Sequence, residues 1–180
     1  MKKTITLLAL MILTVSVFAQ KKTTTSATVS FDATTAKDNL PKADNKTVIA
    51  SFNTQTGEVA FEAAVKNFSF SNPQMQQHFN GAQWFQSDTY PVFTFTGKIE
   101  DNKKVKYSKD GVYKVNVTGS MKIRDITNKL KVTGTVTVKG GKITVASNFK
   151  IRLADYKIGG VPVESGKIDK EPKVSVAAEF

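Results

Sequence analysis

Apolar and polar residues alternate with period two along most of the chain, a pattern typical of half-buried β-strands. Val48, Ala50 and Phe52 share one side of such a segment, and Phe93 and Phe95 share one side of another. Val, Thr and Phe, which recur in these segments, suit pleated and half-buried surfaces. We therefore predict an antiparallel all-β fold with eight strands, at roughly residues 27–33, 46–53, 58–68, 91–100, 112–120, 128–138, 142–153 and 173–180.

Turn signals separate these segments. Gly140-Gly141 lies between two predicted strands, and both positions tolerate the positive φ that a two-residue hairpin requires. Thr54–Gly57 predicts a second hairpin loop, and Asp110-Gly111 predicts another turn. Residues 20–26 are polar and show no alternation, so we predict a mobile lead-in there.

One segment departs from the strand pattern. Asn72-Pro73 suits the N-cap and first position of a helix, and Met75 and Phe79 then fall on one helical face. Asn80-Gly81 is a helix-stop signal. The sequence therefore predicts a short helix over residues 73–79, inserted between two strands.

The strand pattern leaves two architectures open. Eight antiparallel strands can close into a barrel, which removes exposed edges and leaves room for one small ligand. A β-sandwich would use the same pattern. The long apolar stripe from Ile143 to Leu153 favours a bent barrel strand. With no internal repeat and no linker, we predict a single domain over residues 20–180.

The first 19 residues predict an export signal. A basic start, Met1-Lys2-Lys3, precedes an apolar run from Ile5 to Phe18 that is too short for a membrane helix. We predict cleavage after Ala19 and a protein of the periplasm or the cell exterior. The chain has no cysteine, which excludes disulfides and a lipid anchor through cysteine.

The chain carries 26 Lys and Arg against 15 Asp and Glu, a net charge of +11. That excess suits an anionic partner, and it also suits a lysine-rich surface that keeps strand edges from pairing. We favour the second interpretation. A single-stranded nucleic-acid site would interleave basic residues with exposed aromatic ones. That arrangement is absent from the sequence, so we expect no nucleic-acid partner.

Candidate catalytic chemistry is sparse. His78 is the single histidine, and with no cysteine available it lacks the partners of a zinc site, so we predict a structural residue and no metal or cofactor. The acidic residues are scattered along the chain. A hydrolase that uses two such carboxylates, which would have to face one cleft, is an alternative. We expect, however, that the protein is not an enzyme.

Aromatic residues gather between positions 68 and 95. Such side chains line pockets for apolar ligands, and they serve equally well as a plug that completes a core. We predict that Trp84 and Phe85 form the mouth of a hydrophobic cavity. Its predicted lining residues are Phe68, Phe70, Met75, Phe79, Phe93 and Phe95.

Three stretches resemble the YceI-like family, the polyisoprenoid-binding, lipocalin-like barrel proteins. The first, FSFSNPQMQQHFNGAQWFQSDTYPVFTFTGKI, runs over residues 68–99. The second and third are VTGSMKIRDITNKLKVTGTVTV at residues 117–138 and FKIRLADYKIGGVPV at residues 149–163. The chain departs from the family pattern at Asp125, where glycine is usual, and it resembles a short secreted variant.

The resemblance implies an eight-stranded antiparallel barrel with one short helix and a hydrophobic cavity. It also implies a partner, a long-chain lipid or isoprenoid, which the exported protein would sequester or carry without catalysis or a metal. The alternative is an envelope or stress interaction module whose core is filled. A homodimer stays open.

Overall fold

The computed structural model describes residues 21–180, so the predicted export signal lies outside the described residues. The strands are β1 (Lys21–Asp32), β2 (Lys42–Asn53), β3 (Glu58–Ala64), β4 (Ser69–Phe70), β5 (Val92–Ile99), β6 (Gly111–Ile123), β7 (Ile126–Lys139), β8 (Lys142–Lys150) and β9 (Lys173–Glu179). The helices are α1 (Pro73–Asn80) and α2 (Val161–Glu164). Short 3₁₀ turns are η1 (Val65–Asn67), η2 (Asn102–Lys104) and η3 (Leu153–Tyr156).

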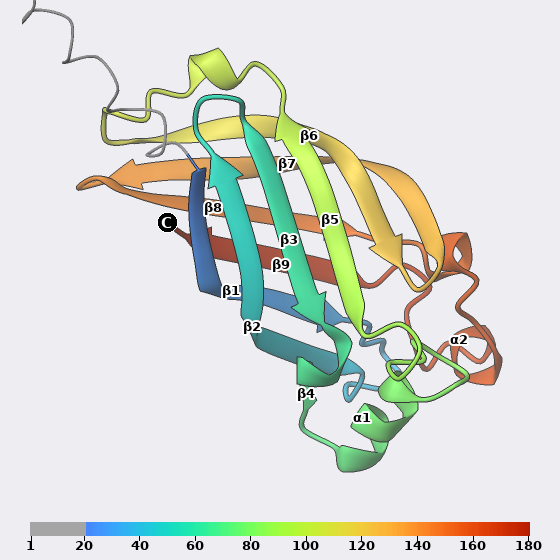
Figure 1. Ribbon diagram of the computed structural model, residues 1–180. Coiled ribbons are helices and arrows are strands. Elements are labelled where there is room, and N and C mark those ends of the chain that lie inside the picture. The colour runs from blue at the N-terminus through green and yellow to red at the C-terminus, as the bar shows by residue number, and fades with distance from the viewer. Residues whose placement is uncertain (1–20) are drawn as a thin grey trace, which may run out of the picture.

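The strands form one antiparallel sheet in the order β1-β9-β8-β7-β6-β5-β3-β2-β4, and β1 also pairs with β2. That last pairing closes β1–β3 and β5–β9 into a ring, and the short β4 pairs with the start of β2. The ring is the predicted eight-stranded lipocalin-like barrel (Figure 1). Closure decides between the two architectures that the strand pattern left open, because a sandwich has no such pairing.

The period-two pattern turns one side of each strand into the barrel. On β2, Val48, Ala50 and Phe52 are at most 1% exposed, whereas the intervening Ile49 is 49% exposed. On β8, Ile143 and Val145 are buried in the same way. Burial of these alternate positions therefore places the apolar face of every strand in one shared interior.

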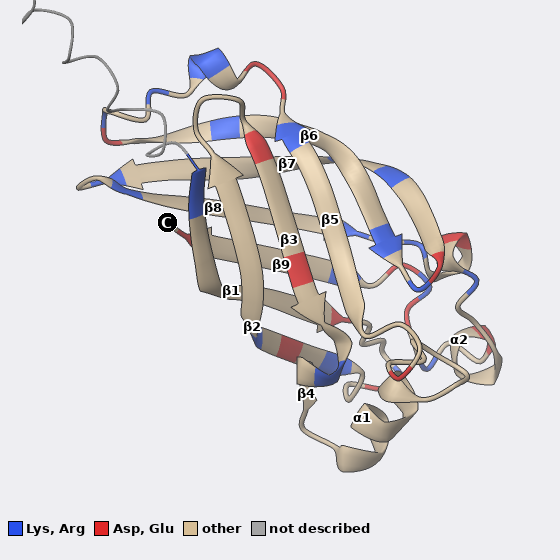
Figure 2. Cartoon of the chain, in the orientation of Figure 1, with Lys and Arg blue, Asp and Glu red and all other residues tan. Residues whose placement is uncertain are grey.

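The helices lie at one end of the barrel. α1, the loop after it and the β6–β7 turn lie at that end next to α2, whereas the β2–β3 and β7–β8 turns and η2 lie at the other end (Figure 1). α1 itself carries no charged residue, whereas Lys and Arg are spread over the strands and the far loops (Figure 2). None of the helices in residues 21–180 has the length and apolar character needed to cross a membrane.

Two sequence predictions hold in detail. α1 begins at Pro73 after Asn72, whose side chain accepts hydrogen bonds from the backbone of Gln74 and Met75. The hairpin at Gly140-Gly141 has φ angles of +56° and +81°. Both φ angles are positive, as a type I′ hairpin turn requires at its two central residues, and glycine adopts them without strain.

Several predicted bounds were wrong. The strand predicted over residues 58–68 ends at Ala64 and is followed by η1, and the strand predicted over residues 46–53 begins at Lys42. Residues 21–26 belong to β1 and not to a mobile lead-in, because Lys21–Thr24 pair with β2 at residues 50–53. Residues 21–26 are polar, so they show no alternation of apolar and polar positions. Their extended conformation comes from the pairing of β1 with β2. The strand predicted over residues 142–153 ends at Lys150. Beyond it Ile151 N–H still donates to the Pro172 carbonyl at 3.2 Å, but Pro172 has no N–H to donate in return, so the regular pairing ends.

Phe95 packs over two glycines inside the barrel. Gly97 and Gly119 face each other across β5 and β6. A Cβ atom at Gly119 would lie 2.4 Å from the carbonyl oxygen of Thr96 and 2.6 Å from Cζ of Phe95. The two glycines therefore let the Phe95 ring lie flat against the wall.

We expect Gly119→Ala to destabilise the barrel by about 1–3 kcal/mol, the usual cost of forcing extra atoms into a packed core. Gly159→Ala is the control, because nothing lies within 4 Å of a Cβ atom at Gly159. Urea unfolding of both variants measures the difference. Equal stabilities of the two variants would contradict this account of the paired glycines.

Candidate ligand-binding cavities

A cavity of about 100 Å³ lies inside the barrel. Its walls come from β1, β3, β5–β9 and the residue after η1, and apart from Thr94 and Ser147 they are apolar side chains. The lining consists of Val29, Val59, Phe61, Ala63, Phe68, Phe93, Thr94, Phe95, Val117, Met121, Leu130, Val132, Val145, Ala146, Ser147, Phe149, Val174 and Val176. No acidic or basic side chain of residues 21–180 lines this space, so it suits an uncharged apolar group.

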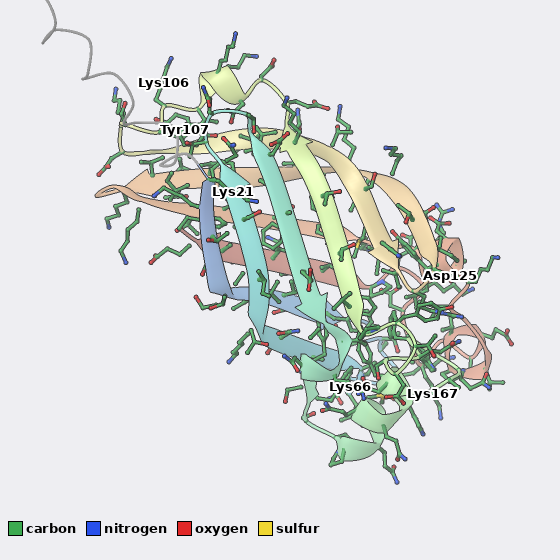
Figure 3. All side chains as sticks on the ribbon, in the orientation of Figure 1. Lys21, Lys66, Lys106, Tyr107, Asp125 and Lys167 are labelled. Carbon is green, nitrogen blue, oxygen red and sulfur yellow. The ribbon has the colours of Figure 1, made fainter. Side chains whose placement is uncertain are left out.

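The end of this cavity away from α1 is closed by aromatic rings. The Phe52 ring lies 5.7 Å from that of Tyr107 and 5.8 Å from that of Phe180, between ring centroids. Figure 3 shows Tyr107 at the end of the barrel opposite α1. The Tyr107 hydroxyl donates a hydrogen bond to Oδ1 of Asn102, and Nδ2 of Asn102 donates to the Thr54 carbonyl at 2.8 Å.

A second cavity of about 250 Å³ lies at the helix end. α1, α2 and the segments around Phe31 and Pro41 enclose it. Its lining residues are Phe31, Asp38, Pro41, Phe70, Met75, His78, Phe79, Trp84, Pro162, Lys167 and Ile168. This helix-end pocket is therefore amphiphilic, with apolar walls and a few groups able to meet a polar head. Figure 3 shows Lys167 at this end of the molecule.

The loop after α1 is held by backbone and side-chain contacts. Phe85 N–H donates to the Phe79 carbonyl at 3.2 Å, and Ser87 N–H donates to the Asn80 carbonyl at 3.0 Å. Arg124, at the β6–β7 turn, donates from Nη1 to the Trp84 carbonyl at 3.4 Å. Its guanidinium also lies 5.8 Å from the centroid of the Tyr90 ring. These contacts fix Trp84 and Phe85 over the barrel end.

The eight predicted ligand-binding residues do not share one cavity. Phe68, Phe93 and Phe95 line the barrel cavity. Phe70, Met75, Phe79 and Trp84 line the helix-end pocket. Phe85, predicted at the mouth, is 1% exposed and packs between the two spaces instead.

Other lining residues escaped the sequence analysis. Phe61 and Ala63 alternate with Glu62, and Val174 and Val176 alternate with Ser175, so strand parity already placed them on one face. Pro162 and Ile168 belong to a segment with no alternation and a helix of four residues. No periodic signal marks such a short element, and its position depends on tertiary packing.

The polar candidates take peripheral places. His78 is exposed and lies on the rim of the helix-end pocket. Asp38 is the one acidic residue of the described chain on the walls of either cavity. Asp155 and Glu171 both face Arg152 at the surface, at 3.8 Å and 3.6 Å. Within residues 21–180 no three His, Cys, Asp or Glu side chains come together as a metal site would require.

A closed antiparallel barrel with an apolar interior is the architecture of the lipocalin-like barrels, whose interior is wide enough to be filled by side chains or to hold one small ligand. A sequence model described as the YceI-like domain matches residues 14–180, and the chain belongs to the YceI-like family. No curated protein matches the chain.

Solved structures share the fold. BcnA of Burkholderia cenocepacia has 19% identity and a TM-score of 0.70, over 86% of this chain and 96% of that one. A polyisoprenoid binding domain from Saccharophagus degradans, implicated in plant cell wall breakdown, has 15% identity and a TM-score of 0.71, over 86% and 93%. The Campylobacter jejuni YCEI protein has 19% identity and a TM-score of 0.54, over 74% and 80%. At these identities the likeness is one of fold.

Tyr107 gives a pH-dependent test of the closed end. Burial raises the pKa of Tyr107 from 10.0 to about 12. The unfolded chain therefore loses this proton at lower pH than the folded one does, and the stability that Tyr107 contributes falls as the pH rises from 10 towards 12. We expect Tyr107→Phe to be less sensitive to pH over this range.

Urea unfolding of the wild type and of Tyr107→Phe at several alkaline pH values measures the effect. The difference in unfolding free energy between the two proteins is expected to narrow as the pH rises. A difference that stays constant up to pH 12 would show that the Tyr107 hydroxyl is not buried as described.

Proposed function

We propose that the protein binds a long-chain apolar molecule, a polyisoprenoid or a fatty-acid-like lipid, and carries or sequesters it without chemical change. The observation that carries this proposal is the apolar barrel cavity, which no charged side chain of residues 21–180 lines. A filled core, as the alternative interaction module would have, leaves no such space. The polyisoprenoid binding domain with the same fold adds support.

Binding would come from burial. Each methylene group removed from water contributes about 0.8 kcal/mol, so a long chain gains affinity without many polar contacts. The helix-end pocket would receive the polar end of such a molecule, because Lys167 and His78 lie on its walls. Lys167 suits a carboxylate or phosphate head, and the barrel interior suits the tail.

The direct test is native mass spectrometry of the protein purified from its own cells, before and after solvent extraction. We expect a bound apolar molecule before extraction, and uptake of a fluorescent polyene fatty acid after it. Absence of both a co-purifying lipid and polyene uptake would contradict the proposed function.

A cavity-filling variant locates the binding site. Val176 lines the barrel cavity, whereas its neighbour Ser175 is exposed on the outer face of β9. We expect Val176→Phe to weaken polyene binding about tenfold or more, because the larger ring takes up space that the ligand would fill. A tenfold weaker affinity corresponds to a loss of about 1.4 kcal/mol of binding free energy. Ser175→Phe adds the same ring outside and is expected to leave binding unchanged. Equal affinities of the two variants would place the ligand outside the barrel.

We also propose that the protein is exported to the periplasm or the cell exterior. The proposal rests on the basic start and apolar run of residues 1–19. Mass spectrometry of the protein isolated from its own cells is expected to give Gln20 as the first residue. A protein that retains residues 1–19 in the cytoplasm would contradict export.

A further inference from the structure

The two cavities are separate compartments. No residue lines both the barrel cavity and the helix-end pocket. Each is also small, at about 100 Å³ and about 250 Å³, below the roughly 300–1,000 Å³ of sites for drug-sized ligands. A long chain bound as proposed above would therefore have to occupy both compartments and cross whatever lies between them.

Aromatic rings lie between the compartments, and Phe79 is at their centre. Its ring is in contact with rings that line each space. Measured between centroids, the Phe79 ring lies 4.4 Å from Phe85, 4.9 Å from Phe70, 5.5 Å from Phe68, 5.8 Å from Phe31 and 6.4 Å from Phe93. Phe68 and Phe93 line the barrel cavity, and Phe31 and Phe70 line the helix-end pocket. The Phe79 ring, with that of Phe85 behind it, therefore lies between the rings that line the two spaces.

The element that carries Phe79 is weakly anchored. α1 has eight residues, and Phe79 is its one buried residue. Its polar ties to the barrel include a hydrogen bond from Phe70 N–H to Oε1 of Gln76 at 3.3 Å. Oδ1 of Asn80, at the end of the helix, is buried without a hydrogen-bond partner among the described residues. To join the two compartments, the Phe79 ring would have to leave its place among these five rings.

We infer that Phe79 is a specificity-determining residue: its ring divides the interior, and an apolar chain too long for one compartment binds only by displacing that ring. The inference rests on the proposed function, and it adds that the protein discriminates between ligands by the length of their apolar chain. A chain that fits one compartment gains affinity with each methylene group. A chain that must extend from one compartment into the other has to displace the Phe79 ring. The free energy of the contacts that Phe79 then loses reduces the affinity gained from the additional methylene groups.

A chain-length series tests the inference. Dissociation constants are measured for straight-chain fatty acids from hexanoate to stearate, by displacement of a fluorescent polyene fatty acid. For the wild type we expect affinity to rise by up to about fourfold per methylene group. At the chain length that must pass Phe79 the rise is expected to stop, and we call this point the break in the series. In Phe79→Ala the break is expected to disappear, so that the longest acids bind about tenfold tighter than they bind the wild type.

Phe70→Ala is the matched control. It removes a ring that lines the helix-end pocket and contacts Phe79, but it leaves the Phe79 ring between the compartments. Whatever it does to affinity, it is expected to keep the break. Phe79→Leu, which preserves an apolar anchor for α1, is expected to reduce the break while thermal unfolding stays cooperative.

The outcomes are distinguishable. A break of unchanged size in both Phe79 variants, or a steady rise with no break in the wild type, overturns the role of Phe79 and leaves lipid binding intact. A wild type that binds no fatty acid and no polyene of any length overturns the proposed function itself.

Discussion

Hydrogen bonds between β1 and β2 close the sheet, and the interior exists because of them. Lys21–Thr24 pair with residues 50–53, and β1 pairs with β9 further along. Register shifts after Thr24 and after Ala27 bend β1 so that one strand serves both neighbours. With no open edge in the ring, the apolar face of each strand has no alternative to the shared interior.

A ring of eight strands leaves its two ends to be covered by other means. One end is closed by the rings of Phe52 on β2, Tyr107 in the loop after η2, and Phe180, which follows β9. α1 and the segment after it close the other end with rings on elements outside the ring of strands. The second closure depends on a helix with one buried residue and on the loop after it, which carries the buried Trp84 and Phe85.

The sequence predicted the strands, the glycine hairpin and the helix, because each depends on local chemistry. Val48, Ala50 and Phe52 alternate since one side of β2 is buried, and Asn72 caps α1 through its own side chain. The first residues of β1 escaped prediction because β2, distant in sequence, determines their conformation. The predicted aromatic residues do gather at the helix end and in the barrel, and their role in binding a ligand stays a prediction.

The sequence did not separate these residues into two cavities. The sequence around Phe79 and around Phe85 gives no sign of which ring lines a cavity. Only the packing of α1 against the barrel places Phe79 among five other rings. Similarly, Phe95 needs both Gly97 and Gly119, which meet only when β5 and β6 pair. Contacts of this kind depend on the relative position of distant elements, which a single sequence does not encode in any short pattern.

The proposed function requires an apolar chain to lie inside the closed barrel. A fatty acid carrying a nitroxide near its terminal methyl group, added to protein with labelled valine methyl groups, tests it most directly by NMR. The account predicts that the signals of Val145 and Val174, which line the barrel cavity, broaden while that of Val112, which is 68% exposed, stays sharp. Broadening confined to Val112 and other exposed methyl groups would contradict the account.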